Sequence, residues 1–266
     1  MSNSCNPLDM SKPRSSWSVA ADPCNPGHFY ACCGMLEVAS CLSMQAVGWW
    51  EGERFHFSGD PTLREVLTAL VSANIIPQPS EMPDREDGEP VGTKRVPMVV
   101  EVAGSRLFIE WYRDTSIKGW TGNQDIVSIF NTMKGLVDPD DPEPLLARTS
   151  SDVIPAGFDS SRVASVPLSC GFSADAVGLR SPICPAVESL PIIGLQRWRP
   201  QREQGSNMLT YATWNRDLDI NSASVVGSCR MKFRGATKYL WKTVSKSTKD
   251  HKIFGPATMS AEEVCT

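Results

Sequence analysis

The sequence predicts a mixed α+β fold, in which short strands and amphipathic helices are interleaved along the chain. Two patterns support this class. In some segments apolar residues recur at three- and four-residue steps, as in a helix with one buried face, and in others they alternate with polar residues, as in a half-buried strand. With 266 residues, 41% of them hydrophobic, and eight tryptophans, the chain can bury the core of one large domain or two small ones.

Helical spacing is clearest in residues 28–44, where one apolar face contains Ala31, Met35, Val38, Ala39 and Leu42. Asn25 or Pro26 is expected to begin this helix, because both residue types are common at helix starts. The same spacing predicts helices over 62–73 and 124–134, and a short helix over 186–190.

Strands are expected where β-branched and aromatic residues alternate with polar ones. These segments are 15–21, a hairpin over 48–57, a second hairpin formed by 96–102 and 106–112, and then 158–167, 195–199, 209–214 and 229–234. Ranges 77–92 and 137–157 are rich in acid and proline and are expected to be loops.

These boundaries suggest a domain organisation with two α+β modules. The expected parts are a flexible N-terminus over 1–14, a first module over 15–136, an acidic linker or loop over 137–157, a second module over 158–235 and a basic C-terminal segment over 236–266. No apolar run reaches the roughly 18 residues needed to cross a bilayer, and the polar N-terminus lacks the apolar core of a signal peptide. A cytoplasmic protein with no membrane partner is therefore expected.

Several chemical classes find no support in the sequence. The nine cysteines include no C-x-x-C pair, so reduced thiols are expected rather than a zinc site. The motifs of phosphate-binding loops, dinucleotide-binding folds and zinc proteases do not occur. No metal and no small-molecule cofactor is therefore expected.

The charge of the chain is concentrated near its C-terminal end. Residues 229–252 contain eight lysines and arginines and one acid, Asp250, in a protein whose net charge is −4. Within this range, Arg230, Lys232 and Arg234 would share one face of the strand expected over 229–234. Lysines spaced as on one helix face then predict a basic helix; they are Lys238, Lys242, Lys246 and Lys249. A cationic element in an acidic protein favours a phosphate or an acidic surface as its partner.

A second cationic element is the segment Arg197-Trp198-Arg199, whose two guanidiniums are suited to phosphate. The alternative is a core tryptophan flanked by solvated arginines. The candidate nucleic-acid-binding residues are thus Arg197, Arg199, Arg230, Lys232, Arg234, Lys238, Lys242 and Lys246. Three aromatic residues, Phe233, Tyr239 and Trp241, are available either for stacking on bases or for the core.

No catalytic residue is assigned. A histidine could act as general base in metal-independent RNA cleavage, but His28, His56 and His251 have no partner at motif spacing. Glu37 and Glu188 lie on otherwise apolar helices and are expected to pair with arginines inside the fold. The acidic clusters over 81–89 and 138–143 are expected to be solvated loops rather than metal sites.

Four segments resemble one known family: NPGHFYACCGMLEVAS (25–40), CGFSAD (170–175), PAVESL (185–190) with GLQRWRP (194–200), and YATW (211–214). Together they resemble the accessory RAMP-like protein of type I-U (type I-G) CRISPR-Cas systems over about residues 17–227. The glycine-rich loop of many RAMP proteins is not evident, since Gly227, Gly235 and Gly255 are isolated. The basic segment after residue 229 lies outside the resemblance.

The resemblance implies a ferredoxin-like, RRM-type RAMP fold with two such modules and long loops. It also implies a non-catalytic RNA-binding or scaffolding subunit of a type I CRISPR effector complex in antiviral defence. Its partners would be guide RNA or target DNA and other CRISPR effector subunits. Two alternatives stay open: a metal-independent endoribonuclease that processes precursor guide RNA, and a protein–protein adaptor that links the effector to its helicase-nuclease.

Overall fold

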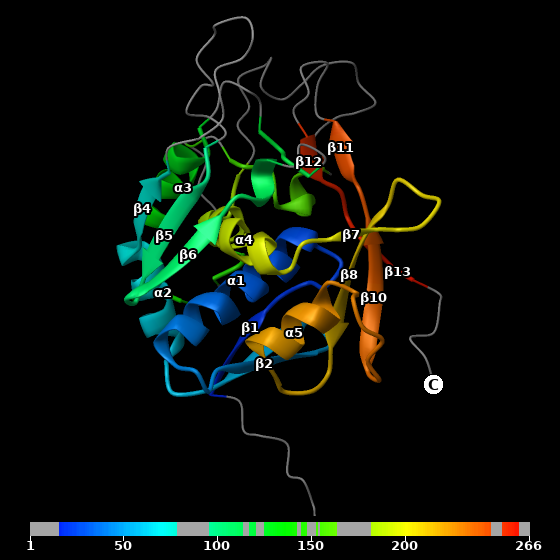
Figure 1. Ribbon diagram of the computed structural model, residues 1–266, viewed down its shortest axis with the longest axis horizontal. Helices are drawn as coiled ribbons and strands as arrows, with labels where there is room; N and C mark the ends of the chain where they lie inside the picture. Colours follow the sequence, from blue (N-terminus) through cyan, green and yellow to red (C-terminus); the bar gives the residue numbers. More distant parts are fainter. Residues whose placement is uncertain are drawn as a thin grey trace, which may run out of the picture.

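The computed structural model confirms a mixed α+β fold built from antiparallel sheets and helices (Figure 1). It describes residues 16–78, 96–113, 117–120, 125–142, 145–147, 153, 155–163, 182–245 and 252–260. The N-terminus expected to be flexible therefore lies outside the described residues. The same applies to 79–92 of the first expected loop and to the acidic cluster over 81–89.

The first sheet contains a split βαβ unit, in which a third strand lies between the two strands that a helix connects. Its strands are β1 (Trp17–Ala20), β2 (Val47–Glu51), β3 (Arg54–Ser58) and β9 (Leu218–Asp219), in the order β1-β3-β2-β9. β3 lies antiparallel between β1 and β2, and helix α1 (Pro26–Leu42) connects those two strands. β9 belongs to the second half of the chain, so this sheet joins the two halves.

Two buried helices cross in the middle of the molecule (Figure 1). α1 begins after Asn25, whose side chain accepts a hydrogen bond from the N–H of Gly27, and it packs against α4 (Pro185–Arg197). The two backbones nearly touch. A Cβ added at Gly34 would lie 2.2 Å from the carbonyl oxygen of Leu190, and one at Gly194 would lie 2.3 Å from that of Tyr30. Glycine is thus required at this crossing.

The remaining sheets lie on opposite sides of this helix pair (Figure 1). One consists of β4 (Asn74–Pro77), β5 (Met98–Val102) and β6 (Ser105–Ile109), near helices α2 (Leu63–Ser72) and α3 (Ile126–Gly135). The other contains β7 (Gln201–Arg202), β8 (Leu209–Trp214), β10 (Ala236–Trp241) and β13 (Thr258–Met259), in the order β13-β10-β8-β7. β11 (Thr243–Ser245) pairs with β12 (Lys252–Phe254), and α5 (Ile220–Gly227) follows β9. Short 3-10 helices cover Trp111–Arg113 and Ser160–Val163.

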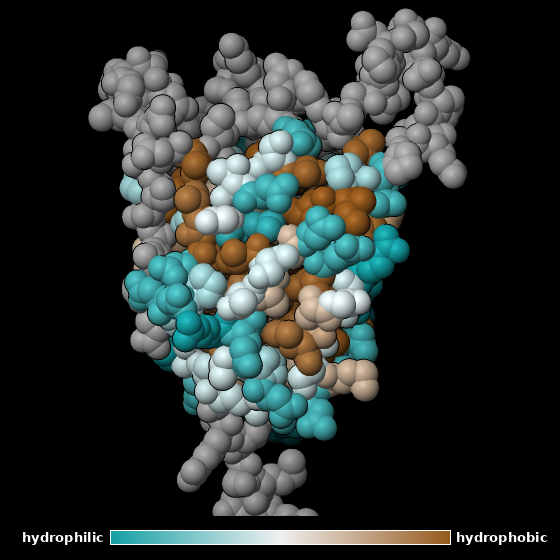
Figure 2. Space-filling model, turned by 90° about the vertical axis from the view of Figure 1, so that its left-hand side faces the viewer, coloured by the Kyte–Doolittle hydropathy of each residue, from teal (hydrophilic) through white to brown (hydrophobic). Residues whose placement is uncertain are grey.

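The two halves of the chain share one hydrophobic core. The ring centroids of Phe29 and Tyr211 are 4.2 Å apart, and the indole N–H of Trp214 donates to the carbonyl oxygen of Gly48 at 2.6 Å. Whether 15–136 and 158–235 fold as separate modules stays a prediction, but their apolar side chains are continuous in space. On the side formed by β4–β6, α2 and α3, apolar side chains are interspersed with polar ones (Figure 2).

Most of the expected elements of the first half are confirmed. The helix expected over 62–73 is α2, which has a capping box between Thr62 and Glu65, and the helix expected over 124–134 is α3, capped by Asp125. Both hairpins form, as β2–β3 and β5–β6. β4, which pairs with β5, was not expected, because its four residues lie directly against the proline-rich loop.

Four predictions of the second half are wrong. Residues 160–163 of the strand expected over 158–167 form a 3-10 helix, and 164–167 lie outside the described residues. The helix expected over 186–190 is confirmed, but it is part of the longer helix α4, which continues through Pro191 to Arg197, so the strand expected over 195–199 is wrong. Although an interior proline removes a helical hydrogen bond, burial of the side chains around it offsets that cost.

The strand expected over 229–234 is instead a turn that follows α5, and the basic helix expected from Lys238 begins as strand β10. Tyr239 and Trp241 alternate with more exposed residues along β10, which is paired on both sides, with β8 and β13. Two-residue periodicity therefore prevails over the four-residue spacing of the lysines. Residues 246–251 lie outside the described part of the chain.

Candidate nucleic-acid interface

Three arginines from separate segments converge on one hollow of about 210 Å³, which we call the arginine hollow. Its lining residues are Trp111, Ile117, Arg199, Pro200, Gln201, Arg202, Leu209 and Arg230. Arg199 and Arg230 are predicted site residues that lie 31 positions apart in the sequence. Arg202 was not among the candidates, because it stands alone in a polar segment with no motif around it.

Arg199 reaches the hollow because α4 ends directly before it. The last turn is fixed by Trp198, which is fully buried and donates its indole N–H to the carbonyl oxygen of Ala223 at 3.1 Å. The guanidinium of Arg199 lies 3.8 Å from the carboxylate of Glu110. Gln196 holds that acid in place, since its side-chain oxygen accepts from the backbone N–H groups of Glu110 and Trp111 at 3.0 and 3.1 Å.

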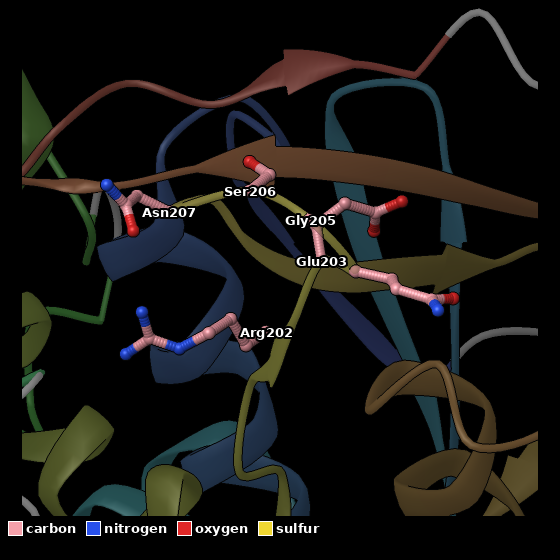
Figure 3. Close-up of a pocket in the computed structure, with 6 residues that line it drawn as sticks. Arg202, Glu203, Gly205, Ser206 and Asn207 are labelled. Atoms are coloured by element: carbon pink, nitrogen blue, oxygen red, sulfur yellow. The ribbon is translucent and has the colours of Figure 1, made fainter.

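Arg202 lies on the edge strand β7, opposite Leu209 of β8. It also lines a second, more open hollow of about 450 Å³ over the β7–β8 turn, which we call the turn hollow. Figure 3 shows the guanidinium of Arg202 extending to one side of this segment and the side chain of Glu203 to the other. Arg202 is therefore shared by the two hollows.

Arg230 is positioned by the way in which α5 ends. The N–H of Cys229 donates to the carbonyl oxygen of Val226 at 2.9 Å, and the N–H of Arg230 donates to that of Val225 at 3.0 Å. These two hydrogen bonds form the Schellman motif, in which the residue that follows the helix C-cap has a left-handed backbone conformation. Cys229 occupies that position with φ 56°. The reversal ends the helix and turns Arg230 towards the hollow.

The arginine hollow carries uncompensated positive charge. Within the described part of the chain, the guanidiniums of Arg202 and Arg230 have no hydrogen bond or ion pair, and both residues are exposed. Arg199 shares Glu110 with Arg113, whose guanidinium lies 3.4 Å from the same carboxylate. An anion entering the hollow would therefore meet two free guanidiniums and one that is partly neutralised. Arginine is the side chain best suited to bind phosphate through paired N–H groups.

The other predicted cations are distributed differently. Lys232 and Arg234 are exposed on the turn that contains Arg230, and Lys242 is exposed between β10 and β11. Lys238 is engaged, because its ammonium group lies 2.9 Å from the carboxylate of Glu203. Lys246 lies outside the described residues.

Arg197 does not share the arginine hollow with Arg199. Its guanidinium donates to Glu37 and to the side-chain oxygen of Asn221, and it lines a separate hollow of about 390 Å³ beside β6. The hydrogen bonds to Glu37 raise the pKa of Arg197. The predicted pairing of Glu37 with an arginine is thus confirmed. The two arginines do not lie on the strand expected over 195–199, because Arg197 is the last residue of α4 and Arg199 follows the helix.

The three aromatic residues proposed for base stacking belong to the core. Tyr239 and Trp241 are 7% and 0% exposed, and Phe233 is partly buried against the same cluster. The rings of Trp241 and Phe254 lie 4.4 Å apart between centroids. A base therefore has no open ring face on Tyr239 or Trp241, whereas Phe233 keeps part of its surface exposed.

Two of the candidate histidines occupy structural positions. His28 is largely buried near the start of α1, and its Nδ1 accepts from the N–H of Asp22 at 3.1 Å. Burial lowers the pKa of His28, and the carboxylates of Asp159 and Asp22 offset part of that effect. His56 stacks on Trp49, with 5.3 Å between ring centroids. His251 lies outside the described residues.

Glu188 is fully buried and holds the loop before the 3-10 helix at 160–163. Its carboxylate accepts from the backbone N–H groups of Gly157, Phe158 and Asp159 at 2.8–3.3 Å. An arginine partner for Glu188 stays a prediction. In the cluster over 138–143, Asp140 pairs with Arg64. Among the described residues, no group of three or more histidine, cysteine or acidic side chains is placed to hold a metal.

Comparisons with known proteins identify no relative. A scan against models of protein families, a search of curated proteins and a search of solved structures each returned no match for this chain. No helix in the described part of the chain is both long and apolar enough to span a membrane. The fold and the site together define an α+β protein in which three arginines line a surface hollow.

Proposed function

We propose that this protein is a non-catalytic RNA-binding subunit of a type I CRISPR effector complex, in which it grips the phosphate backbone of guide RNA. The observation that carries the proposal is the convergence of Arg199, Arg202 and Arg230 on one hollow, with Lys232 and Arg234 exposed on the same turn. Guanidiniums without partners at a concave surface attract phosphate. The guide itself would supply sequence recognition through base pairing.

Two further observations support the CRISPR assignment. The resemblance to the RAMP-like accessory protein covers about residues 17–227, which include α1, α4 and β8. The split βαβ unit formed by β1, α1 and β2 is a building unit of the ferredoxin-like, RRM-type fold that the resemblance implies. RRM domains bind single-stranded RNA on their sheets, whereas here the candidate surface is an arginine hollow at the edge of a second sheet.

The direct test is a salt titration of single-stranded RNA binding by fluorescence anisotropy. Replacing Arg199, Arg202 and Arg230 together by glutamine should weaken binding by roughly tenfold or more at low salt. It should also reduce the slope of log K against log salt by about 0.7 for each phosphate contact that is lost. Arg64→Gln is the matched control, because Arg64 is an exposed arginine on α2, on the opposite side of the molecule from β7. An unchanged salt slope in the triple variant would exclude this surface.

Membership of the effector is tested by purifying the tagged protein from cells that carry its complete CRISPR locus. Mature guide RNA together with effector subunits is the expected result. Protein partners that persist after nuclease treatment, without RNA affinity of the free protein, would favour the adaptor. Precursor RNA alone would favour processing, and the absence of both RNA and CRISPR partners would refute the assignment.

A further inference from the structure

The arginine hollow is too small for a whole nucleotide. Its volume of about 210 Å³ lies below the roughly 300–1,000 Å³ of pockets that hold drug-sized ligands. Its walls are partly apolar, since Trp111, Ile117, Pro200 and Leu209 contribute to the lining. Trp111 is fixed there, because its indole N–H donates to the carbonyl oxygen of Ile192 at 2.8 Å. Size and lining together suit a single compact anion.

The net positive charge of the hollow is larger than the single negative charge of an internal phosphate of an RNA strand. Three guanidiniums, less the one carboxylate of Glu110, leave two positive charges, even without Arg113 on the far side of that acid. An internal phosphodiester carries one negative charge. A phosphomonoester carries about 1.5 to 2 negative charges at pH 7 and exposes three oxygens to forked donors.

The surroundings provide room for the nucleoside attached to such a group. Arg202 lines both the arginine hollow and the turn hollow of about 450 Å³, so the two are adjacent. The turn hollow is lined by polar side chains, among them Gln204 and the residues Ser206 and Asn207, which Figure 3 labels. These groups can donate to and accept from a ribose or a base edge.

We infer that the arginine hollow binds the terminal phosphomonoester of a single-stranded RNA, with the adjoining nucleoside in the turn hollow. This inference rests on the proposed RNA-binding function and adds the part of the RNA that is recognised. The hollow therefore anchors one end of the RNA. Lys232 and Arg234, which are exposed on the turn that contains Arg230, contact the phosphates next to that end.

The test compares one short RNA sequence in three forms: with a 5′-phosphate, with a 3′-phosphate, and with hydroxyl groups at both ends. We expect one phosphorylated form to bind about tenfold more tightly than the hydroxyl form. The Arg202→Gln/Arg230→Gln variant should lose this preference, and inorganic phosphate should compete with the preferred RNA. Both residues are exposed, so the variant should keep the thermal midpoint of the wild type.

The outcomes separate the inference from the proposed function. Equal affinity for all three RNAs, weakened equally by the double variant, would overturn the inference and leave the RNA-binding function intact. Failure of every RNA to bind would overturn both. Tight binding of one phosphorylated form also identifies which end of the strand the hollow takes. Arg202→Lys/Arg230→Lys keeps the charge but lacks the fork, so partial retention of the preference is expected.

Discussion

The guanidinium of Arg197 at the end of α4 is bound side-on to the carboxylate of Glu37 in α1, with Nε–Oε2 and Nη2–Oε1 distances of 2.6 and 2.9 Å. Glu37 is only 4% exposed, so this arginine neutralises a carboxylate that would otherwise be buried without a counter-charge. Arg197 is therefore part of the helix crossing, whereas Arg199, two residues later, faces an open hollow.

Loss of Arg197 should therefore reduce stability rather than RNA affinity. Arg197→Met keeps the apolar stem but leaves Glu37 unpaired, and we expect a loss of about 2 kcal/mol in the free energy of unfolding. Adding Glu37→Leu should recover most of that loss, because it removes the buried charge. Urea denaturation measures both effects, and an unchanged midpoint in Arg197→Met would contradict the assigned role.

The crossing of α1 and α4 should be intolerant of any side chain at Gly34. Gly34→Ala places a methyl group 2.2 Å from the carbonyl oxygen of Leu190, so the helices must separate, at a cost of about 1–3 kcal/mol. Gly135→Ala in α3 is the control, since a Cβ there meets no atom within 4 Å. The control should be neutral or stabilising by up to about 1 kcal/mol. Equal thermal midpoints for the two variants would show that the close approach is absent.

The turn between β5 and β6 offers a stabilising substitution. Ala103 and Gly104 have φ 49° and 79°, as in the two-residue turns that match the twist of a hairpin and favour Asn-Gly. Ala103 is exposed, so Ala103→Asn should raise the free energy of unfolding by about 0.5–1 kcal/mol through relief of backbone strain. Gly104→Ala should lower it. Chemical denaturation measures both effects. If the two substitutions changed the free energy of unfolding in the same direction, the assigned turn geometry would be wrong.

Stability should fall in mild acid, partly because of His28. Since burial lowers the pKa of His28, the unfolded chain binds its proton more readily, near pH 6.5. The contribution of His28 is therefore complete above that pH and is lost as the pH falls below it. His28→Asn keeps an acceptor for the N–H of Asp22 but does not titrate. Between pH 7.5 and 5.5 the His28→Asn variant should lose less unfolding free energy than the wild type. An equal loss in the two proteins would show that His28 does not contribute to the fall in stability.

The local sequence pattern was sufficient to predict a helix or strand wherever the capping residues and the apolar periodicity lie within the element itself. Asn25 and the apolar steps that follow it predict α1, and the alternation around Gly52 predicts the β2–β3 hairpin. The side chains of these elements carry enough burial and capping signal in a short window. The pairing of Glu37 with an arginine was also predictable, since a carboxylate on an apolar helix requires a counter-charge. Which arginine would meet it was not.

The tertiary structure decided what spacing alone left ambiguous. Lys238 and Lys242 fit either a helix or a strand edge, and pairing of β10 with β8 and β13 selects the strand. Pro191 would end an isolated helix, yet burial keeps α4 continuous. The arginine hollow exists only because the end of α4, the edge strand β7 and the turn after α5 meet in space. The sequence by itself determined the mixed α+β class, most elements of the first half and the excess of positive charge near the C-terminal end. Contacts between segments that are distant in the sequence decided which arginines line a hollow and which form ion pairs. Such contacts depend on how the helices and strands pack, and the residues next to each arginine in the chain do not reveal them.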